Sequence, residues 1–262
     1  MLPKRCEELW QAYVQSENVR IRAQLTEALT AFLIEFKNAP DDIRARWTHK
    51  LARQVVDENA PIVIRMPLFR EVLFPSLLDG FSARKPGCAR WLAGFAQLLY
   101  KSPDCIAKLP ESARTEHGLL LCALEVDPKD NLAKQRLLKI LRSHFDYVLH
   151  ELPAGVLYGQ DGATVEQCAE LEHELRFFKT LAEDCGTFET DGALFAEAEF
   201  HLRAYPQYLR TRKSGDTYER FLSKETGRAH SPTPPPPPSL VRATRSSHRG
   251  NPRAPSAQIF AG

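Results

Sequence analysis

The feature that most constrains this chain is the spacing of its apolar residues, which return every three or four positions through most of the sequence. This spacing places apolar side chains on one face of an α-helix, whereas the alternation typical of a half-buried strand is almost absent. A clear example is the series Cys168, Leu171, Leu175, Phe178, Ala182 and Cys185. The sequence therefore predicts an all-α protein of about 8–10 helices, arranged as a bundle or as irregular, solenoid-like stacked hairpins.

Prolines, glycines and capping residues set the expected ends of the helices. We expect helices near residues 4–14, 17–37, 41–58, 67–81, 87–101, 111–126, 127–152, 164–185 and 191–212. Ser16 is expected to cap the second helix, and Pro75 to kink or split the fourth. Asp127 and Pro128 form a strong helix start, because aspartate accepts from free amides and proline has no amide to leave unpaired. The β-branched run at residues 62–64 is too short for a sheet and predicts a buried connection.

The helical spacing ends near residue 213. Residues 214–262 lose the apolar pattern, and from Ala229 they contain a proline run at residues 234–238 followed by arginines and serines. Such a composition has too little apolar surface to fold alone, and the proline run favours polyproline II. We therefore predict one helical domain over residues 1–213 and a disordered, proline-rich, basic tail over residues 214–262.

The charge balance argues against a dedicated nucleic-acid-binding domain. The chain has 35 basic and 33 acidic side chains, and the part from Ala229 onward holds four arginines and no acidic residue. The rest is therefore close to neutral, unlike the strongly basic surface that nucleic-acid-binding domains usually present. Only weak, salt-dependent contact is expected, through the tail arginines Arg242, Arg245, Arg249 and Arg253.

The cysteines and the N-terminal residues favour a reducing compartment. The six cysteines form no close pair, most fall on apolar helix faces, and residues 1–8 contain no apolar signal region. The longest apolar run, residues 119–124, is far shorter than the ~20 residues of a membrane-spanning helix. We expect free thiols, no transmembrane segment and a cytoplasmic location.

One short segment resembles a known repeat family. Residues 123–133 read A-L-E-V-D-P-K-D-N-L-A, so that a helix ends in Ala-Leu, an Asp-Pro turn follows, and Ala133 comes six residues after Asp127. This arrangement resembles the junction of tetratricopeptide repeats, although Asp130 stands where that family usually has asparagine and no second copy lies 34 residues away. The resemblance implies stacked helical hairpins and no particular ligand.

Glu170 and His173 have the spacing of half a di-iron carboxylate site, because side chains three residues apart share a helix face. A complete site needs a second Glu-x-x-His and two more inward glutamates, which the sequence lacks. Glu166, Glu170 and Glu174 recur every four residues and instead predict a solvated acidic face. We therefore predict no metal and no cofactor, and we take Glu166, Glu170 and Glu174, with the aromatic Trp91, as candidate contacts for a partner.

Two classes of function remain open. No nucleotide-binding, hydrolase or metalloprotease motif is present, and the apolar settings of Cys122 and Cys168 predict inert packing. This favours a non-catalytic protein–protein interaction module, of the adaptor or immunity type, that binds another protein through its helical surface. The alternative is an all-α enzyme, or a receptor for a small ligand or metal, with an interhelical pocket lined by His144, His150, Tyr158 or Glu170.

Overall fold

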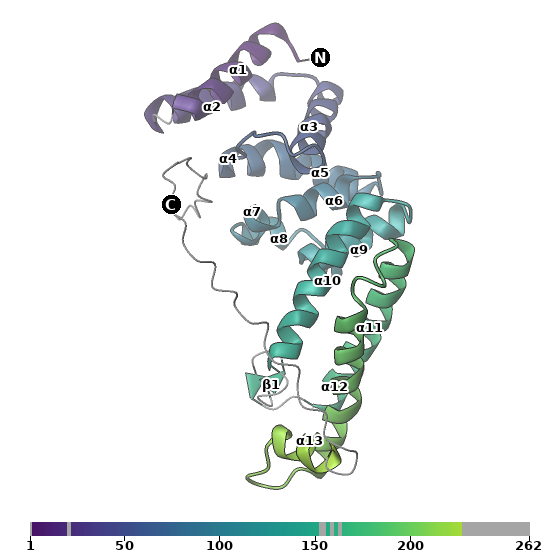
Figure 1. Cartoon of the computed structure of the whole chain (residues 1–262). Coiled ribbons are helices and arrows are strands. Elements are labelled where there is room, and N and C mark those ends of the chain that lie inside the picture. Colours follow the sequence, from purple (N-terminus) through teal and green to yellow (C-terminus); the bar gives the residue numbers. More distant parts are fainter. Residues whose placement is uncertain (1, 20–21, 152–155, 158–159, 162–163, 227–262) are drawn as a thin grey trace, which may run out of the picture. The chain divides into compact units, whose positions relative to one another are not determined.

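In a computed structural model of the chain, the described residues fold almost entirely as helices (Figure 1). The structure describes residues 2–19, 22–151, 156–157, 160–161 and 164–226. By its contacts the chain divides into a unit of Met1–Phe221 and a unit of Leu222–Gly262. The predicted all-α fold is confirmed, since the only strands among the described residues are the two-residue β1 (Val156–Leu157) and β2 (Gln160–Asp161), which pair antiparallel.

The first three helices meet around a cluster of aromatic rings. They are α1 (Lys4–Val19), α2 (Arg22–Lys37) and α3 (Asp41–Val56). The ring centroid of Trp47 on α3 lies 4.9 Å from that of Trp10 on α1 and 5.1 Å from that of Phe36 on α2. The predicted cap at Ser16 is wrong, because the Ser16 hydroxyl donates to the carbonyl of Ala12 and α1 continues past it.

The middle of the chain consists of short helices. They are α4 (Met66–Leu68), the π-helix η1 (Phe69–Leu73), α5 (Phe74–Ser82), α6 (Cys88–Gly94), α7 (Ala96–Tyr100), α8 (Pro103–Ile106), the 3-10 helix η2 (Glu111–Ala113) and α9 (Glu116–Val126). Pro75 has no amide to donate to the carbonyl of Glu71, and the helix takes π spacing just before it. The predicted split at Pro75 does not occur, because the backbone stays helical from Met66 to Ser82 and only its spacing changes. The prediction of one continuous helix over residues 87–101 is wrong, because the backbone leaves helical geometry at Phe95.

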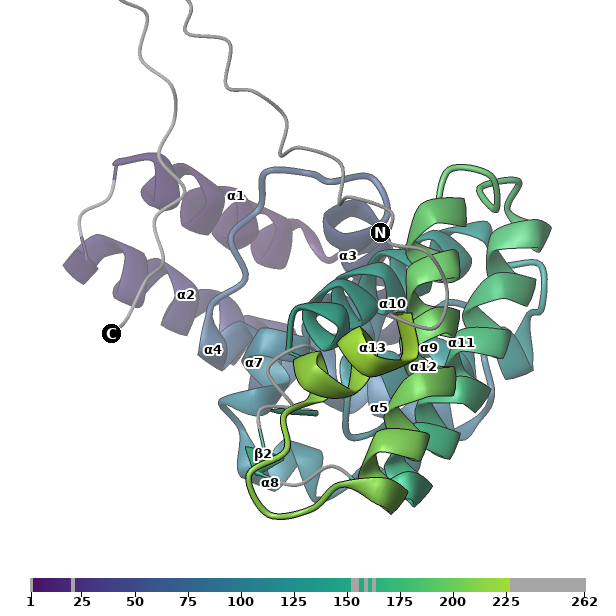
Figure 2. The same ribbon diagram turned by 60° about the horizontal axis from the view of Figure 1, so that its bottom comes forward.

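Three long helices follow and lie side by side (Figures 1 and 2): α10 (Asn131–Glu151), α11 (Val165–Asp184) and α12 (Gly192–Thr211). Their apolar faces meet through aromatic rings, with Phe178 of α11 between Phe145 of α10 and Phe195 of α12. Thr164 caps α11 as predicted and forms a capping box with Gln167. The helical faces predicted from the apolar spacing therefore form this part of the core.

The predicted start of α10 at Asp127 is wrong. The Asp127 carboxylate accepts a hydrogen bond from the amide of Lys129 and closes a turn, so it does not cap the helix. Asp130 accepts from the amide of Ala133 and caps α10, which begins at Asn131. The segment that resembles a tetratricopeptide junction thus forms the turn between α9 and α10.

Helical structure continues past residue 213, in α13 (Tyr218–Thr226). Tyr218 is 1% exposed, its hydroxyl lies 3.0 Å from Nδ1 of His201, and its ring contacts those of Tyr205 and Tyr208. The prediction of disorder from residue 214 is therefore wrong for α13, because this aromatic cluster anchors an otherwise polar segment. Residues 227–262 of the predicted tail, with the proline run, lie outside the described residues.

Arg90 of α6 joins three parts of the fold through two buried carboxylates. Its guanidinium donates to both oxygens of Asp57, at 3.0 and 2.7 Å, and to Asp130 at the start of α10. The side chains of Arg90, Asp57 and Asp130 are 11%, 9% and 6% exposed. Asp57 also accepts from the indole N–H of Trp91 at 2.8 Å. These bonds offset the free-energy cost of burying the charges. The compensation is lost if any one of the partners is removed.

Replacing Arg90 with methionine is expected to lower the free energy of unfolding by about 3–5 kcal/mol, because Asp57 and Asp130 would stay buried without their cation. Urea unfolding followed by circular dichroism measures the change. The matched control is Arg70→Met, since the Arg70–Asp104 pair is about half exposed and such pairs contribute under about 1 kcal/mol. Equal losses for the two variants would contradict the buried network.

Two half-buried histidines, His49 and His117, and the buried His201 are expected to make stability depend on pH. Burial lowers the pKa of His49, His117 and His201. A histidine with a lowered folded-state pKa stabilises the chain fully above the unfolded value of ~6.5, and this stability is lost as the pH falls through the folded pKa. We expect the urea concentration at the unfolding midpoint to decrease when the pH is lowered from about 7.5 to about 5.5. His201→Asn should reduce this fall, whereas substitution of the exposed His173 with asparagine should leave it unchanged.

Candidate functional site

The acidic residues predicted on α11 do not form a single exposed face. Glu166, Glu170 and His173 are exposed, whereas Glu174 is half-buried, with its carboxylate 3.4 Å from Nε2 of His144 on α10. The interaction with His144 lowers the pKa of the Glu174 carboxyl. Within the part of the chain that the structure describes, no group of three or more histidine, cysteine or acidic side chains is placed to hold a metal ion.

Trp91 is a core residue. Its side chain is 9% exposed, its indole N–H is bonded to Asp57, and its ring lies against that of His49 at 5.6 Å between centroids. The prediction that Trp91 offers an aromatic contact surface is therefore wrong, because the buried carboxylate and the neighbouring ring hold it inside.

The residues predicted to line an interhelical pocket do not converge. His150 and Glu170 are exposed, and His144 lies beside Glu174. None of these three lines any of four cavities found in the described part of the chain. Tyr158 lies outside the described residues. The geometry thus gives no support to an active site built from this set.

All six cysteines are free thiols, as predicted. Sγ of Cys88 lies 3.9 Å from Nε2 of His49, the arrangement in which a thiolate–imidazolium pair would form. Burial raises the pKa of Cys88 to about 11 and lowers the pKa of His49, so both groups are neutral at pH 7. Burial also raises the pKa of Cys122 and Cys168, in keeping with the prediction that they pack as inert side chains.

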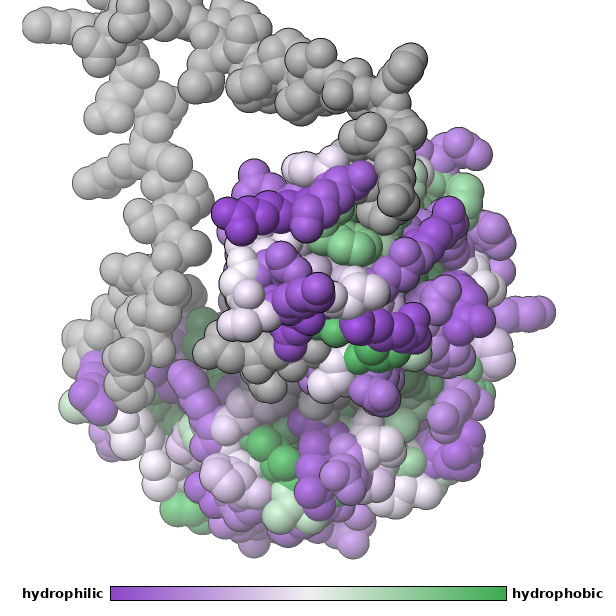
Figure 3. Space-filling model, turned by 90° about the horizontal axis from the view of Figure 1, so that it is seen from below, coloured by the Kyte–Doolittle hydropathy of each residue, from purple (hydrophilic) through white to green (hydrophobic). Residues whose placement is uncertain are grey.

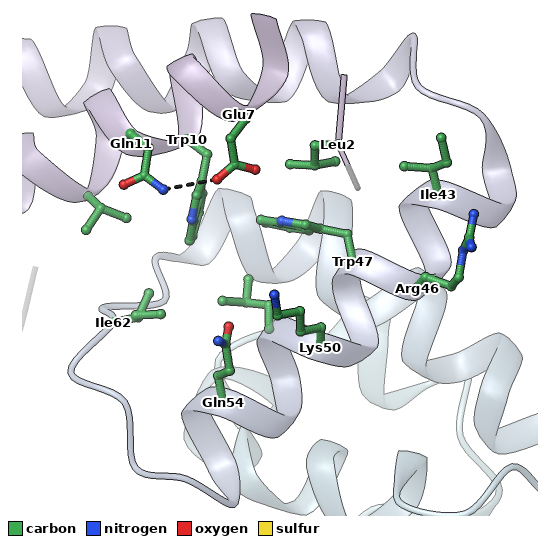
Figure 4. A pocket seen from close by; sticks show the side chains of 12 residues that line it. Leu2, Glu7, Trp10, Gln11, Ile43, Arg46, Trp47, Lys50, Gln54 and Ile62 are labelled. Carbon is green, nitrogen blue, oxygen red and sulfur yellow. Dashed lines mark hydrogen bonds between the residues drawn. The ribbon is translucent and has the colours of Figure 1, made fainter. Parts of the chain in front are cut away.

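A groove of about 560 Å³ lies between α1, α3 and the segment that follows α3 (Figure 4). Both helices supply side chains that share one face, at intervals of three and four residues. From α1 these are Glu7, Trp10, Gln11 and Val14, and from α3 they are Ile43, Arg46, Trp47, Lys50, Leu51 and Gln54. Ile62 lies toward one end of the groove and Leu2 toward the other, beside Ile43 (Figure 4).

Two indole rings form the apolar wall of the groove. Trp10 and Trp47 meet edge to face, and Phe32 of α2 supports both from behind, with centroids at 5.2 and 5.4 Å. Trp10 is almost fully buried, whereas Trp47 is partly exposed. Because the rings hold the three helices together, their positions are fixed before any ligand arrives.

The polar residues of the groove differ in how many of their bonds are already made. Glu7 accepts from the amide of Gln11 at 3.0 Å, and Arg46 is paired with Asp42 at 2.6 Å. Lys50 has no carboxylate within reach among the described residues, and the side-chain amide of Gln54 makes no hydrogen bond to them. The groove therefore presents one unpaired cation and one unpaired amide beside two indole rings.

The third wall is the connection at residues 60–65. The Tyr13 hydroxyl donates to the carbonyl of Val63 at 2.8 Å, and Arg65 makes two bonds to the Glu17 carboxylate, at 2.7 and 2.9 Å. Ile62 and Ile64 are half-buried, whereas Val63 is 51% exposed. The predicted connection exists, but the prediction that it is buried is wrong, because only alternate side chains face the protein.

Trp10 and Trp47 lie on apolar faces of their helices, and no site was predicted there from the sequence. The spacing of apolar residues identifies a helix face but does not tell which part of that face stays uncovered. The available signal was polar: Lys50 and Gln54 lie in register with Trp47 on the same face of α3.

In comparisons with known proteins, no family model, no curated protein and no solved structure matches the chain. Among the described residues, no helix is both long and apolar enough to cross a membrane.

Replacing Tyr13 with phenylalanine is expected to loosen the third wall of the groove. The Tyr13 ring is fully buried, so the substitution keeps the packing and removes only the bond to the Val63 carbonyl. We expect a loss of about 1 kcal/mol in the free energy of unfolding, and faster amide hydrogen exchange at residues 62–65. Unchanged exchange at those amides would show that Tyr13 does not hold the connection. The matched control is Thr30→Val, which also removes one hydroxyl but on the exposed side of α2. It should leave the exchange of the amides at residues 62–65 unchanged.

Proposed function

We propose that this chain is a non-catalytic adaptor-type protein that binds an extended segment of another protein in the groove between α1 and α3. The observation that carries the proposal is the combination of a partly exposed indole, Trp47, with the unpaired Lys50 and Gln54 on the same helix face. Rigid aromatic rings supply contact area at little entropic cost, and nearby polar groups fix the orientation of a bound chain.

The shape of the groove supports a peptide more than a compact small molecule. Its walls are two helices and a connecting segment, and its polar groups lie along α1 and α3 with no convergence on one buried point (Figure 4). Sites for small ligands usually enclose the molecule and direct a few buried polar groups at it. The neutral, buried Cys88–His49 pair also gives no support to the alternative of an enzyme.

Other surfaces support the proposal less well. On the face drawn in Figure 3, polar residues predominate and the apolar residues form small separate patches. Scattered apolar residues of this kind are normal on a protein surface and do not mark a docking site. The six free thiols favour a reducing compartment such as the cytoplasm for the complex.

The proposal is tested by selecting binders from a random peptide library displayed on phage, with the whole chain immobilised. The three tryptophans provide an internal reference. We expect the indole N–H resonances of Trp10 and Trp47 to shift when a selected peptide is added, and that of the buried Trp91 to stay in place. A Lys50→Glu substitution should weaken binding at least about tenfold if the selected peptides carry an acidic residue, which corresponds to about 1.4 kcal/mol.

The matched control for Lys50→Glu is Lys139→Glu on α10, which makes the same change in net charge at an exposed residue outside the groove. It should leave the affinity unchanged. Failure to select any peptide that shifts Trp10 and Trp47, or equal effects of the two substitutions, would contradict the proposed function.

A further inference from the structure

The run Ile62-Val63-Ile64 is unusual in this chain, because three successive β-branched residues favour a strand and the described residues offer no strand beside them. The segment is not helical, and Arg65 at its end has the extended angles φ −84° and ψ 155°. Pro61 and Pro67 limit it on both sides. It is therefore a short extended segment without a partner strand among the described residues.

This segment is held in place from both ends. Asn59 takes a positive φ of 53°, and the amide of Ala60 returns to the carbonyl of Gln54, which turns the chain back from α3. Farther along, Tyr13 and Glu17 of α1 bind Val63 and Arg65. An extended segment fixed in this way loses little freedom when a second chain pairs with it.

The backbone groups of the segment are used on one edge and mostly unused on the other, where, among the described residues, the Ile62 amide alone is bonded, to the Ala60 carbonyl at 2.7 Å. In an extended chain the N–H and C=O groups of successive residues point to opposite edges. The Val63 carbonyl accepts from Tyr13, so the Ile62 carbonyl and both backbone groups of Ile64 belong to the opposite edge. None of these three groups has a hydrogen-bond partner within the described part of the chain. A row of unpaired groups of this kind is a template for strand addition.

We propose that the partner segment binds as a β-strand along the free edge of residues 62–64. This inference rests on the proposed function and names the binding mode. Ile62 lines the groove, and cross-strand neighbours share a face of the sheet, so a partner residue opposite Ile62 directs its side chain into the groove. Lys50, the unpaired cation of the groove, selects an acidic residue in the partner. The ligand class is therefore an extended segment rich in β-branched residues with at least one carboxylate.

The test uses the whole chain and the synthetic peptide Ac-Thr-Val-Glu-Val-Thr-NH2, with binding followed by the indole resonances of Trp10 and Trp47. Two further peptides carry N-methyl groups, one on both valine amides and one on the glutamate and second threonine amides. Because alternate amides face opposite edges, we expect one methylated peptide to lose affinity at least about tenfold and the other to bind within about twofold. The amide of Ile64 should become protected from exchange when the unmodified peptide binds.

A matched pair of protein variants tests the same edge from the other side. Ile64→Pro removes the amide on the free edge and should abolish peptide binding, whereas Val63→Pro removes the amide on the edge facing Tyr13 and should not. Circular dichroism and the Trp91 resonance show whether each variant keeps its fold. If either proline variant fails to fold, the two methylated peptides on the unchanged protein still decide the question.

Three results would overturn strand addition. The first is equal binding of both methylated peptides with shifts at Trp10 and Trp47. That result would keep the groove as a binding site and exclude only strand addition as the binding mode. The second is no binding of the unmodified peptide, in which case the library selection still decides the proposed function by itself. The third is a dimer in sedimentation velocity that Ile64→Pro abolishes, which assigns the free edge to a second copy of this chain.

Discussion

The position of Arg90 between two buried carboxylates is the interaction on which much of this fold depends. Asp57 directly follows α3 and begins the connection that becomes the third wall of the groove, and Asp130 caps α10. A guanidinium offers its donors in a fixed fork, so both carboxylates must stand at defined positions around α6. The same contacts that satisfy three buried charges therefore fix the end of α3 relative to the start of the long helices.

The sequence predicted the helical faces well, because the spacing of apolar residues depends on helix geometry alone. The cap at Thr164 was also predictable, since it follows from a local hydrogen bond, whereas Pro75 changed the spacing of its helix without splitting it. The failures at Ser16 and Asp127 have a common cause, which is that a residue suited to cap a helix can bond elsewhere. Asp130 caps α10 and also meets Arg90, a contact between residues 40 positions apart that no local rule contains.

The candidate site was much less predictable than the fold. Trp10, Trp47 and Trp91 all lie on apolar helix faces, and the sequence gives no reason to separate them. The structure separates them through long-range contacts, because Asp57 and His49 enclose Trp91, whereas Trp47 keeps one side uncovered next to Lys50. The tryptophan selected from the sequence as a contact residue therefore lies in the core.

The proposed binding mode would give the groove two roles that usually conflict, since the rings that hold α1, α2 and α3 together also form its apolar wall. A wall that is part of the core cannot rearrange to fit a ligand without loss of stability. It also needs no ordering on binding, so most of the entropic cost falls on the partner segment. Affinity in such a groove then depends chiefly on how extended the partner already is when free. Segments rich in β-branched residues lose less freedom on becoming a strand, so under the proposed binding mode stiffness, together with charge opposite Lys50, would be the main basis for selection.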